Sequence, residues 1–187
     1  SPYARFREPA SASQMTADQR AAYLRGSRTI PIDSAVVRET LQSLQEDATD
    51  KKALLGAIFR YCHERIAADQ YGPVDAKTAL EESRAAPLGR ARAMVALCRA
   101  AKMPARLVAG FLLQETHSAA PHVWVEVESG GLWLPHDPEY GYAGDLPAHY
   151  LPVRYDGTEI VRPGSAVKEI AARYVLTAIS PPGHAPS

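Results

Sequence analysis

Residues 87–113 read PLGRARAMVALCRAAKMPARLVAGFLL, and residues 121–137 read PHVWVEVESGGLWLPHD. The first block repeats its apolar residues at helical spacing, which predicts a helix over residues 88–101. Pro87 suits a helix start, where the missing N–H costs nothing. The second block alternates apolar and polar residues as a strand does, and Gly130-Gly131 is a hairpin turn signal. We therefore expect a helix followed by paired strands that carry a histidine and an aspartate.

The predicted helix has two chemically distinct sides. One side is apolar, and we expect it to be buried; it contains Ala91, Met94, Val95, Cys98 and Ala101. The other side is basic, and we expect it to face water; it contains Arg90, Arg92, Arg99 and Lys102.

The rest of the chain divides into a helical first half and a strand-rich second half. We expect Thr16 to cap a short helix that ends at Gly26, and Asp33 or Ser34 to cap a second helix. A third helix is expected to begin near residue 50 and to end at Gly72-Pro73. A helical turn is expected at 79–84. Strand patterns occupy residues 106–114, 122–128, 132–135, 150–155, 158–161 and 168–179. This order indicates an α+β fold with N-terminal helices packed on an antiparallel sheet.

The composition limits the class of function. A chain of 187 residues can bury one good core. Its 21 basic residues balance 21 acidic residues, so it is poorly suited to binding nucleic acid. No apolar run approaches the roughly 18 residues of a membrane span. Cys62 and Cys98 show neither a metal-binding spacing nor a disulfide framework, and we expect no cofactor.

His122 and Asp137 are the strongest candidates for chemistry. His122 opens the segment His-Val-Trp124-Val-Glu, and Asp137 follows Trp133 and precedes Pro138. If the two strands are hairpin neighbours, the carboxylate can accept the imidazole N–H and fix its tautomer, as in a Cys-His-Asp triad. The alternative is that His122 is a half-buried sheet residue and Asp137 forms a turn.

With these motifs in this order, the chain resembles the transglutaminase-like (papain-like) superfamily. The resemblance rests on Arg99-Ala-Ala-Lys-Met-Pro-Ala-Arg106, on H-x-W-x-E from His122 and on W-x-x-x-D-P ending in Asp137-Pro, and it covers about residues 51–155. It implies a transglutaminase-like core whose nucleophilic cysteine begins the central helix. Counting back from Arg106, that cysteine falls at or next to Pro87. The resemblance therefore implies degenerate triad positions at Pro87, His122 and Asp137, and no enzyme activity.

The alternative is an active cysteine protease or acyltransferase with a displaced nucleophile. The two thiols of the chain belong to Cys62 and Cys98, which both lie on apolar helix faces. Cysteines in such positions are usually buried and unreactive. Cys98 is also about 16 Å from the start of its helix, judged from the rise per residue.

A narrower group resembles the chain more closely: the inactive transglutaminase domain fused to seven transmembrane helices in bacterial membrane proteins. The shared segments are 87–97, 137–141 and 146–152. The resemblance implies a periplasmic or extracytoplasmic domain of an inner-membrane protein. It also implies association with an ATP-grasp ligase-like protein and a pepsin-like aspartic protease. We expect an N-terminal extension over 1–32, the transglutaminase-like domain over 33–179 and a Pro-rich tail or linker over 180–187.

Without catalysis, the predicted role is binding of a ligand, peptide or protein in a sensor or accessory module. The helix start presents unpaired backbone N–H groups, which together with Arg90 suit a carboxylate. His122, Trp124 and Asp137 are expected to line the opposite wall, so a peptide tail or carboxylated ligand is the predicted guest. A collapsed cleft filled by side chains is the alternative.

Two further interpretations use other residues. The histidines and aspartate that cluster in sequence are His117, His122, His136, Asp137 and His149. His136 and Asp137 are adjacent on a strand and should point to opposite faces, so we expect no metal site. A surface for docking a partner protein could instead form from Tyr140, Tyr142, Tyr150 and Tyr155.

Overall fold

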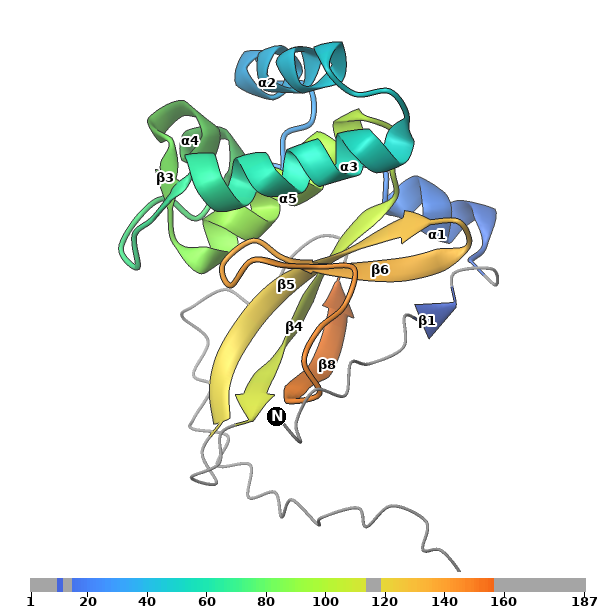
Figure 1. Ribbon diagram of the computed structural model, residues 1–187, viewed down its shortest axis with the longest axis vertical. Coiled ribbons are helices and arrows are strands. Elements are labelled where there is room, and N and C mark those ends of the chain that lie inside the picture. The colour runs from blue at the N-terminus through green and yellow to red at the C-terminus, as the bar shows by residue number, and fades with distance from the viewer. Residues whose placement is uncertain (1–9, 12–14, 114–118, 157–187) are drawn as a thin grey trace, which may run out of the picture.

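The computed structural model describes residues 10–11, 15–113 and 119–156, and it has the predicted α+β architecture, with helices packed against an antiparallel sheet (Figure 1). The helices are α1 (Ala17–Ala22), α2 (Ala35–Glu46), α3 (Lys51–Arg60), α4 (Ala76–Glu82) and α5 (Pro87–Ala100), with a π-helical turn η1 (Tyr61–Arg65) after α3. The strands are β1 (Ala10–Ser11), β2 (Ala67–Ala68), β3 (Arg84–Ala85), β4 (Ala105–Leu113), β5 (Ala119–Ser129), β6 (Leu132–Asp137), β7 (Tyr142–Ala143) and β8 (Tyr150–Asp156). Within the described part of the chain, no helix is long and apolar enough to cross a membrane.

The main sheet has the strand order β1-β6-β5-β4-β8, and β7 pairs with β6. All of these pairs are antiparallel, whereas β2 and β3 form a separate parallel pair. β5 and β6 are joined by Gly130 and Gly131, which have φ angles of 61° and 80°. Two successive positive φ values are the geometry that favours glycine in a tight hairpin turn. The predicted hairpin is therefore confirmed.

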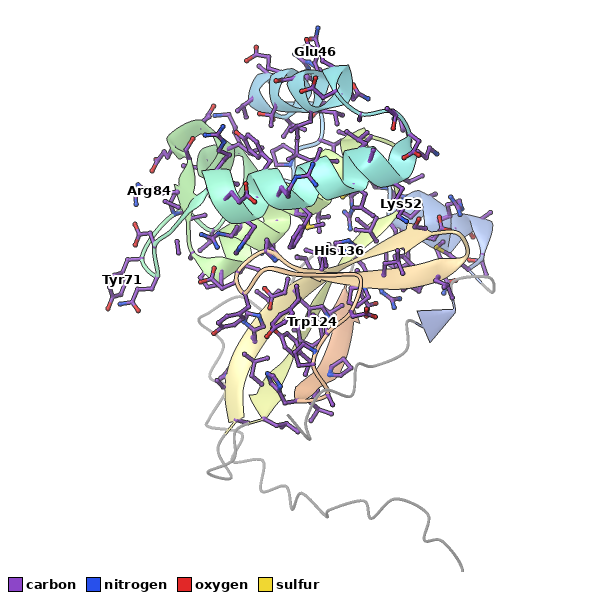
Figure 2. All side chains as sticks on the ribbon, in the orientation of Figure 1. Glu46, Lys52, Tyr71, Arg84, Trp124 and His136 are labelled. Carbon is purple, nitrogen blue, oxygen red and sulfur yellow. The ribbon has the colours of Figure 1, made fainter. Side chains whose placement is uncertain are left out.

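The two faces of the sheet are covered differently. Val123, Val125 and Val127 of β5 pack into the main core with the helices. The alternate residues of β5 face the other way, where Trp124 and Tyr150 belong to a second, smaller core. Figure 2 shows Trp124 among the strands, below the helical layer.

Helix α5 is buried on all sides rather than amphipathic. Its arginines, Arg90, Arg92 and Arg99, are 4%, 6% and 0% exposed. The prediction that they face water is therefore wrong, although Lys102 beyond the helix is exposed as expected. Lys102 has a φ of 61°, the left-handed conformation in which a glycine would be unstrained.

The buried arginines donate hydrogen bonds to backbone carbonyls of neighbouring segments. The carbonyls belong to Pro138 and Ile66 for Arg90, to Val74 for Arg92, and to Ala105 and Arg25 for Arg99. Hydrogen bonds with a charged donor are stronger than neutral ones, which offsets part of the cost of burying the guanidinium groups. A periodicity argument misses this, because it treats every arginine as a surface residue.

The predicted starts of α1, α2 and α3 are confirmed, and the predicted capping is confirmed at Thr16, which caps α1. α2 begins after Ser34, whose side chain makes no capping hydrogen bond, and α3 begins after Asp50, whose carboxylate accepts from Ala53 N–H. Two predicted ends are wrong: α1 stops before Gly26, and α3 passes into η1 and stops well before Gly72-Pro73. The single turn predicted at 79–84 is the longer helix α4. The predicted strands at 158–161 and 168–179 lie outside the described residues.

Residues before position 33 also contribute to the packed structure. β1 pairs with β6, Ala105 N–H donates to Tyr23 O, and Ile30 is wholly buried in the main core. The predicted boundary between an extension over 1–32 and a domain over 33–179 stays a prediction.

The loop that leads from β2 to α4 packs tightly on the start of α5. Ala86 N–H donates to Pro73 O at 3.1 Å. A Cβ added at Gly89 would lie 2.1 Å from the same Pro73 oxygen, so only glycine fits there without movement of the backbone. This loop is therefore fixed at the point where α5 begins.

We predict that Gly89→Ala lowers the free energy of unfolding by about 2–3 kcal/mol, because the new methyl group forces the loop and helix apart. The matched control is Gly56→Ala in α3, where the nearest atom to an added Cβ is Arg60 Nη1 at 3.5 Å. That change should be neutral or stabilise by about 0.5–1 kcal/mol. Urea unfolding measures both, and equal effects would contradict the close packing at Gly89.

Candidate functional site

His122 and Asp137 meet on the sheet face away from the helices. β5 and β6 pair so that Val125 lies opposite His136, which places Asp137 near the β5 end that carries His122. His122 Nε2 lies 2.7 Å from Asp137 Oδ2, and the two side chains are 6% and 0% exposed. The carboxylate accepts the N–H of Nε2, which leaves Nδ1 as the acceptor atom of the ring. The predicted contact between these side chains is present.

Asp137 accepts hydrogen bonds from four groups. Its Oδ2 accepts from His122 at 2.7 Å and from the hydroxyl of Tyr150 at 2.6 Å. Its Oδ1 accepts from the backbone N–H groups of Glu139 at 2.8 Å and Tyr140 at 3.2 Å. Burial and the hydrogen bond to Asp137 raise the pKa of Tyr150, so its hydroxyl stays protonated as the donor. The carboxylate therefore fixes both the imidazole and the turn that follows β6.

Aromatic rings fill the space around the His122 imidazole. Its centroid is 5.1 Å from that of Tyr140, 5.8 Å from Tyr150 and 6.3 Å from Trp124. Trp124 is buried, and among the described residues its Nε1 has no hydrogen-bond partner. Tyr140 is 57% exposed and is the outermost of these rings. The side of the site that His122 and Trp124 form is thus closed by side chains, with Tyr140 nearest to solvent.

The first turn of α5 reaches the turn after Asp137 through Arg90. Pro87 is the first residue of α5, and its predecessor Ala86 provides no side-chain cap. In the first turn, Arg90 Nη1 donates to Pro138 O at 3.0 Å and lies 3.2 Å from Glu139 Oε2, and Nη2 donates to Ile66 O at 2.6 Å. The carboxylate that Arg90 contacts is therefore the protein's own Glu139. Pro138 directly follows Asp137, so Arg90 contacts the chain one residue beyond the histidine–aspartate pair.

The turn after β6 is held from the helical side by a second group. His63 Nδ1 lies 2.8 Å from Pro138 O, so two side chains converge on that carbonyl. The His63 ring also packs on Gly141, where an added Cβ would lie 2.9 Å from Nε2. Gly141 has a φ of 78°, which favours glycine for a second reason. The π-helical turn η1, which carries His63, therefore positions the same turn as Arg90.

Both thiols of the chain are remote from solvent. Cys62 and Cys98 are wholly buried and are not in a disulfide. Burial raises the pKa of both thiols, and in Cys98 it outweighs the lowering by Arg99. The thiolate is the reactive form of cysteine, so neither thiol is prepared to act as a nucleophile.

His136 and Asp137 point to opposite faces, as predicted. His136 packs 5.7 Å from the ring of Phe59 on the helical side, and its Nδ1 donates to Leu134 O at 3.0 Å. Among the described residues, no group of three or more histidines, cysteines and acidic residues could hold a metal ion.

Sequence reasoning missed three residues of this site: Tyr150, Glu139 and His63. Tyr150 stood only as a candidate interface residue, yet its hydroxyl binds Asp137. His63 is far from the site in sequence, and no spacing rule connects it with Pro138. Glu139 follows the Asp-Pro motif directly, and its acidic side chain near a basic helix start was the one signal that could have indicated its pairing with Arg90.

The chain belongs to the transglutaminase-like superfamily, because the family model of that description matches residues 38–138, more than half of the chain. Solved structures share the fold. A candidate cysteine protease from Cytophaga hutchinsonii is 19% identical, with a TM-score of 0.59, over 73% of this chain and 48% of that one. The periplasmic domain of TgpA from Pseudomonas aeruginosa is 22% identical, with a TM-score of 0.54, over 67% of this chain and 48% of that one.

The same TgpA domain bound to ethylmercury is 25% identical, with a TM-score of 0.53, over 68% of this chain and 51% of that one. The chain thus spans about half the length of these solved structures. Comparison with curated proteins finds no match.

We predict that His136 makes stability depend on pH in the acidic range. Burial lowers its pKa to about 4, although the hydrogen bond to Leu134 O opposes this. Because the unfolded chain binds the proton more readily, the stabilisation is complete above about pH 6.5 and falls as the pH drops toward 4, by up to roughly 3 kcal/mol. In His136→Gln this part of the slope should disappear, whereas the exposed His149→Gln should keep it. Urea unfolding between pH 4 and 7 measures this pH dependence. If the free energy of unfolding of His136→Gln depends on pH as strongly as that of the unmodified protein, His136 is not its source.

Proposed function

We propose that this chain is a catalytically inactive transglutaminase-like domain that acts as a binding module. The single observation that carries the proposal is Pro87. It is the first residue of α5, and counting back from Arg106 along the family resemblance puts the nucleophilic cysteine at or next to this position. A proline side chain has no atom that can attack a carbonyl group, so the residual His122–Asp137 pair has no thiol to activate.

The two remaining thiols do not replace the missing one. Cys98 lies in the interior of α5, about 16 Å along the helix from its first residue, and Cys62 belongs to η1. Both are buried in the main core, and burial raises their pKa values. An active cysteine protease or acyltransferase would need one of them to be exposed and paired with the imidazole.

For the location, the similarity to the periplasmic domain of TgpA supports an extracytoplasmic module of a bacterial membrane protein. The resemblance to inactive domains fused to seven transmembrane helices supports the same context. An ATP-grasp ligase-like protein and an aspartic protease are the partners that this resemblance implies.

The proposed guest is a peptide or a carboxylated ligand at the former catalytic cleft. His122, Trp124 and Asp137 would form one wall and Arg90 the other. Because Tyr140 packs against His122 and Glu139 pairs with Arg90, binding at this place requires the turn over residues 138–141 to move. The guest carboxylate would then replace that of Glu139 beside the guanidinium group.

A thiol-labelling experiment combined with activity assays tests the absence of catalysis. In the folded protein we predict that iodoacetamide labels Cys62 and Cys98 only after unfolding, because both are buried. Acyl-transfer and peptidase rates should equal the background rate in the unmodified protein and in His122→Ala alike. Rapid labelling of one cysteine in the native state, together with turnover that disappears in His122→Ala, would establish the active enzyme instead.

A further inference from the structure

Five apolar side chains on three neighbouring strands form one continuous surface. Phe111 of β4 lies directly opposite Pro121 of β5 and Leu151 of β8, and Leu113 lies opposite Ala119. Residues directly opposite each other on antiparallel strands point to the same face, with their Cβ atoms roughly 5 Å apart. Phe111 and Leu113 share that face because they are two residues apart on one strand. We call these five residues the apolar sheet patch.

The apolar sheet patch lies on the helix-side face of the sheet but beyond the helices. Phe111 and Leu107 are an even number of residues apart on β4, so Phe111 points to the same face as that residue of the main core. Figure 1 shows that the ends of β4, β5 and β8 that carry the patch project past the helical layer. Among the described residues, no member of the patch belongs to either core, and Leu151 is 43% exposed. An apolar sheet face is normally buried against a second layer of structure.

The chain that follows β8 is within reach of the apolar sheet patch. β8 ends at Asp156, which lies opposite Leu107, and the sequence continues over residues 157–187. From Leu107 to Phe111 the distance along β4 is about 13 Å. Residues 157–166 can span up to about 33 Å, so the residues after them reach the patch easily. Such a short tether also keeps the segment at a millimolar effective concentration, which favours even a weak contact.

Residues 167–179 have the composition of a segment that covers an apolar surface. They read VKEIAARYVLTAI. Besides the strand pattern noted above, this stretch has a helical one, because Glu169, Arg173 and Thr177 recur at every fourth residue and would line one side of a helix. The apolar side of that helix would contain Val167, Ile170, Ala171, Tyr174, Val175 and Ala178. An amphipathic helix of this length gains most of its stability by packing that side on another surface.

We propose that residues 167–179 dock on the apolar sheet patch as an amphipathic helix. The helical layer of the domain then continues over the projecting part of the sheet. The patch lies on the opposite face from the His122 side chain, because Pro121 and His122 are consecutive residues of β5. The inference is therefore independent of the binding role proposed for the His122–Asp137 site.

Alkylation of single introduced thiols by iodoacetamide tests the proposal in the full chain. Ala171→Cys places a thiol on the apolar side of the proposed helix, and Arg173→Cys places one on the polar side. Each rate is divided by that of the same thiol in urea, which removes differences in intrinsic reactivity. We predict that Ala171→Cys reacts about tenfold more slowly than Arg173→Cys, as expected if the segment is docked about nine-tenths of the time. Cys62 and Cys98 are buried, so the introduced thiol is the one that reacts.

A change in the apolar sheet patch tests whether the patch provides the protection. Leu151→Asp should raise the rate of Ala171→Cys to that of Arg173→Cys, because a carboxylate opposes burial. Leu132→Asp on β6 is the matched control and should leave the rate unchanged, since Leu132 is 41% exposed on the same sheet but is not part of the patch. Unchanged tryptophan fluorescence verifies that both variants are folded.

Three results would overturn the proposal. The first is equal rates for Ala171→Cys and Arg173→Cys, which a strand would also give, because residues two apart on a strand share a face. The second is slow alkylation of Ala171→Cys that Leu151→Asp does not relieve. The third is protection that disappears when the protein is diluted, which would identify a second copy of the chain as the occupant of the patch.

Discussion

Hydrogen bonds from buried guanidinium groups to backbone carbonyls fix the segments that surround α5. Arg90 donates to carbonyls just before β2 and just after β6, and Arg92 donates to a carbonyl in the loop before α4. Arg99 donates to a carbonyl in the N-terminal segment and to one at the start of β4. Removing one guanidinium would leave buried carbonyls unpaired, at a cost of about 1–3 kcal/mol each. The central helix therefore organises the irregular parts of the domain as well as its apolar core, and the site lies where those irregular parts meet.

This arrangement explains how a histidine–aspartate pair can be well ordered without serving catalysis. Asp137 is the acceptor for an imidazole, a phenol and two backbone N–H groups, so it stabilises the turn over 138–141 whether or not a thiol is present. Tyr150 joins β8 to the same carboxylate. The proposed loss of the nucleophile at Pro87 would change the chemistry at the helix start and leave these contacts intact. The retained fold would then serve as the platform for the proposed binding role.

The sequence predicted those features that depend on local pattern. The α+β order, the cap at Thr16, the start of α3 near residue 50, the Gly-Gly hairpin and the meeting of His122 with Asp137 all follow from spacing and turn chemistry. Burial of the α5 arginines could not be predicted, because their acceptors are carbonyls of segments far away in the sequence. The same limit concealed the roles of His63, Tyr150 and Glu139. Each of these side chains acquires its role only when distant elements are packed together.

The most direct test of the central claim is to return a thiol to the start of α5. In a Pro87→Cys variant, the new thiol should have a lowered pKa because the helix N-terminus stabilises the thiolate. We predict that iodoacetamide alkylates it faster at neutral pH than the thiol of a Ser83→Cys control, and that His122→Ala slows this reaction. Equal rates for the two thiols, with no effect of His122→Ala, would contradict the claim that Pro87 occupies the place of the lost nucleophile.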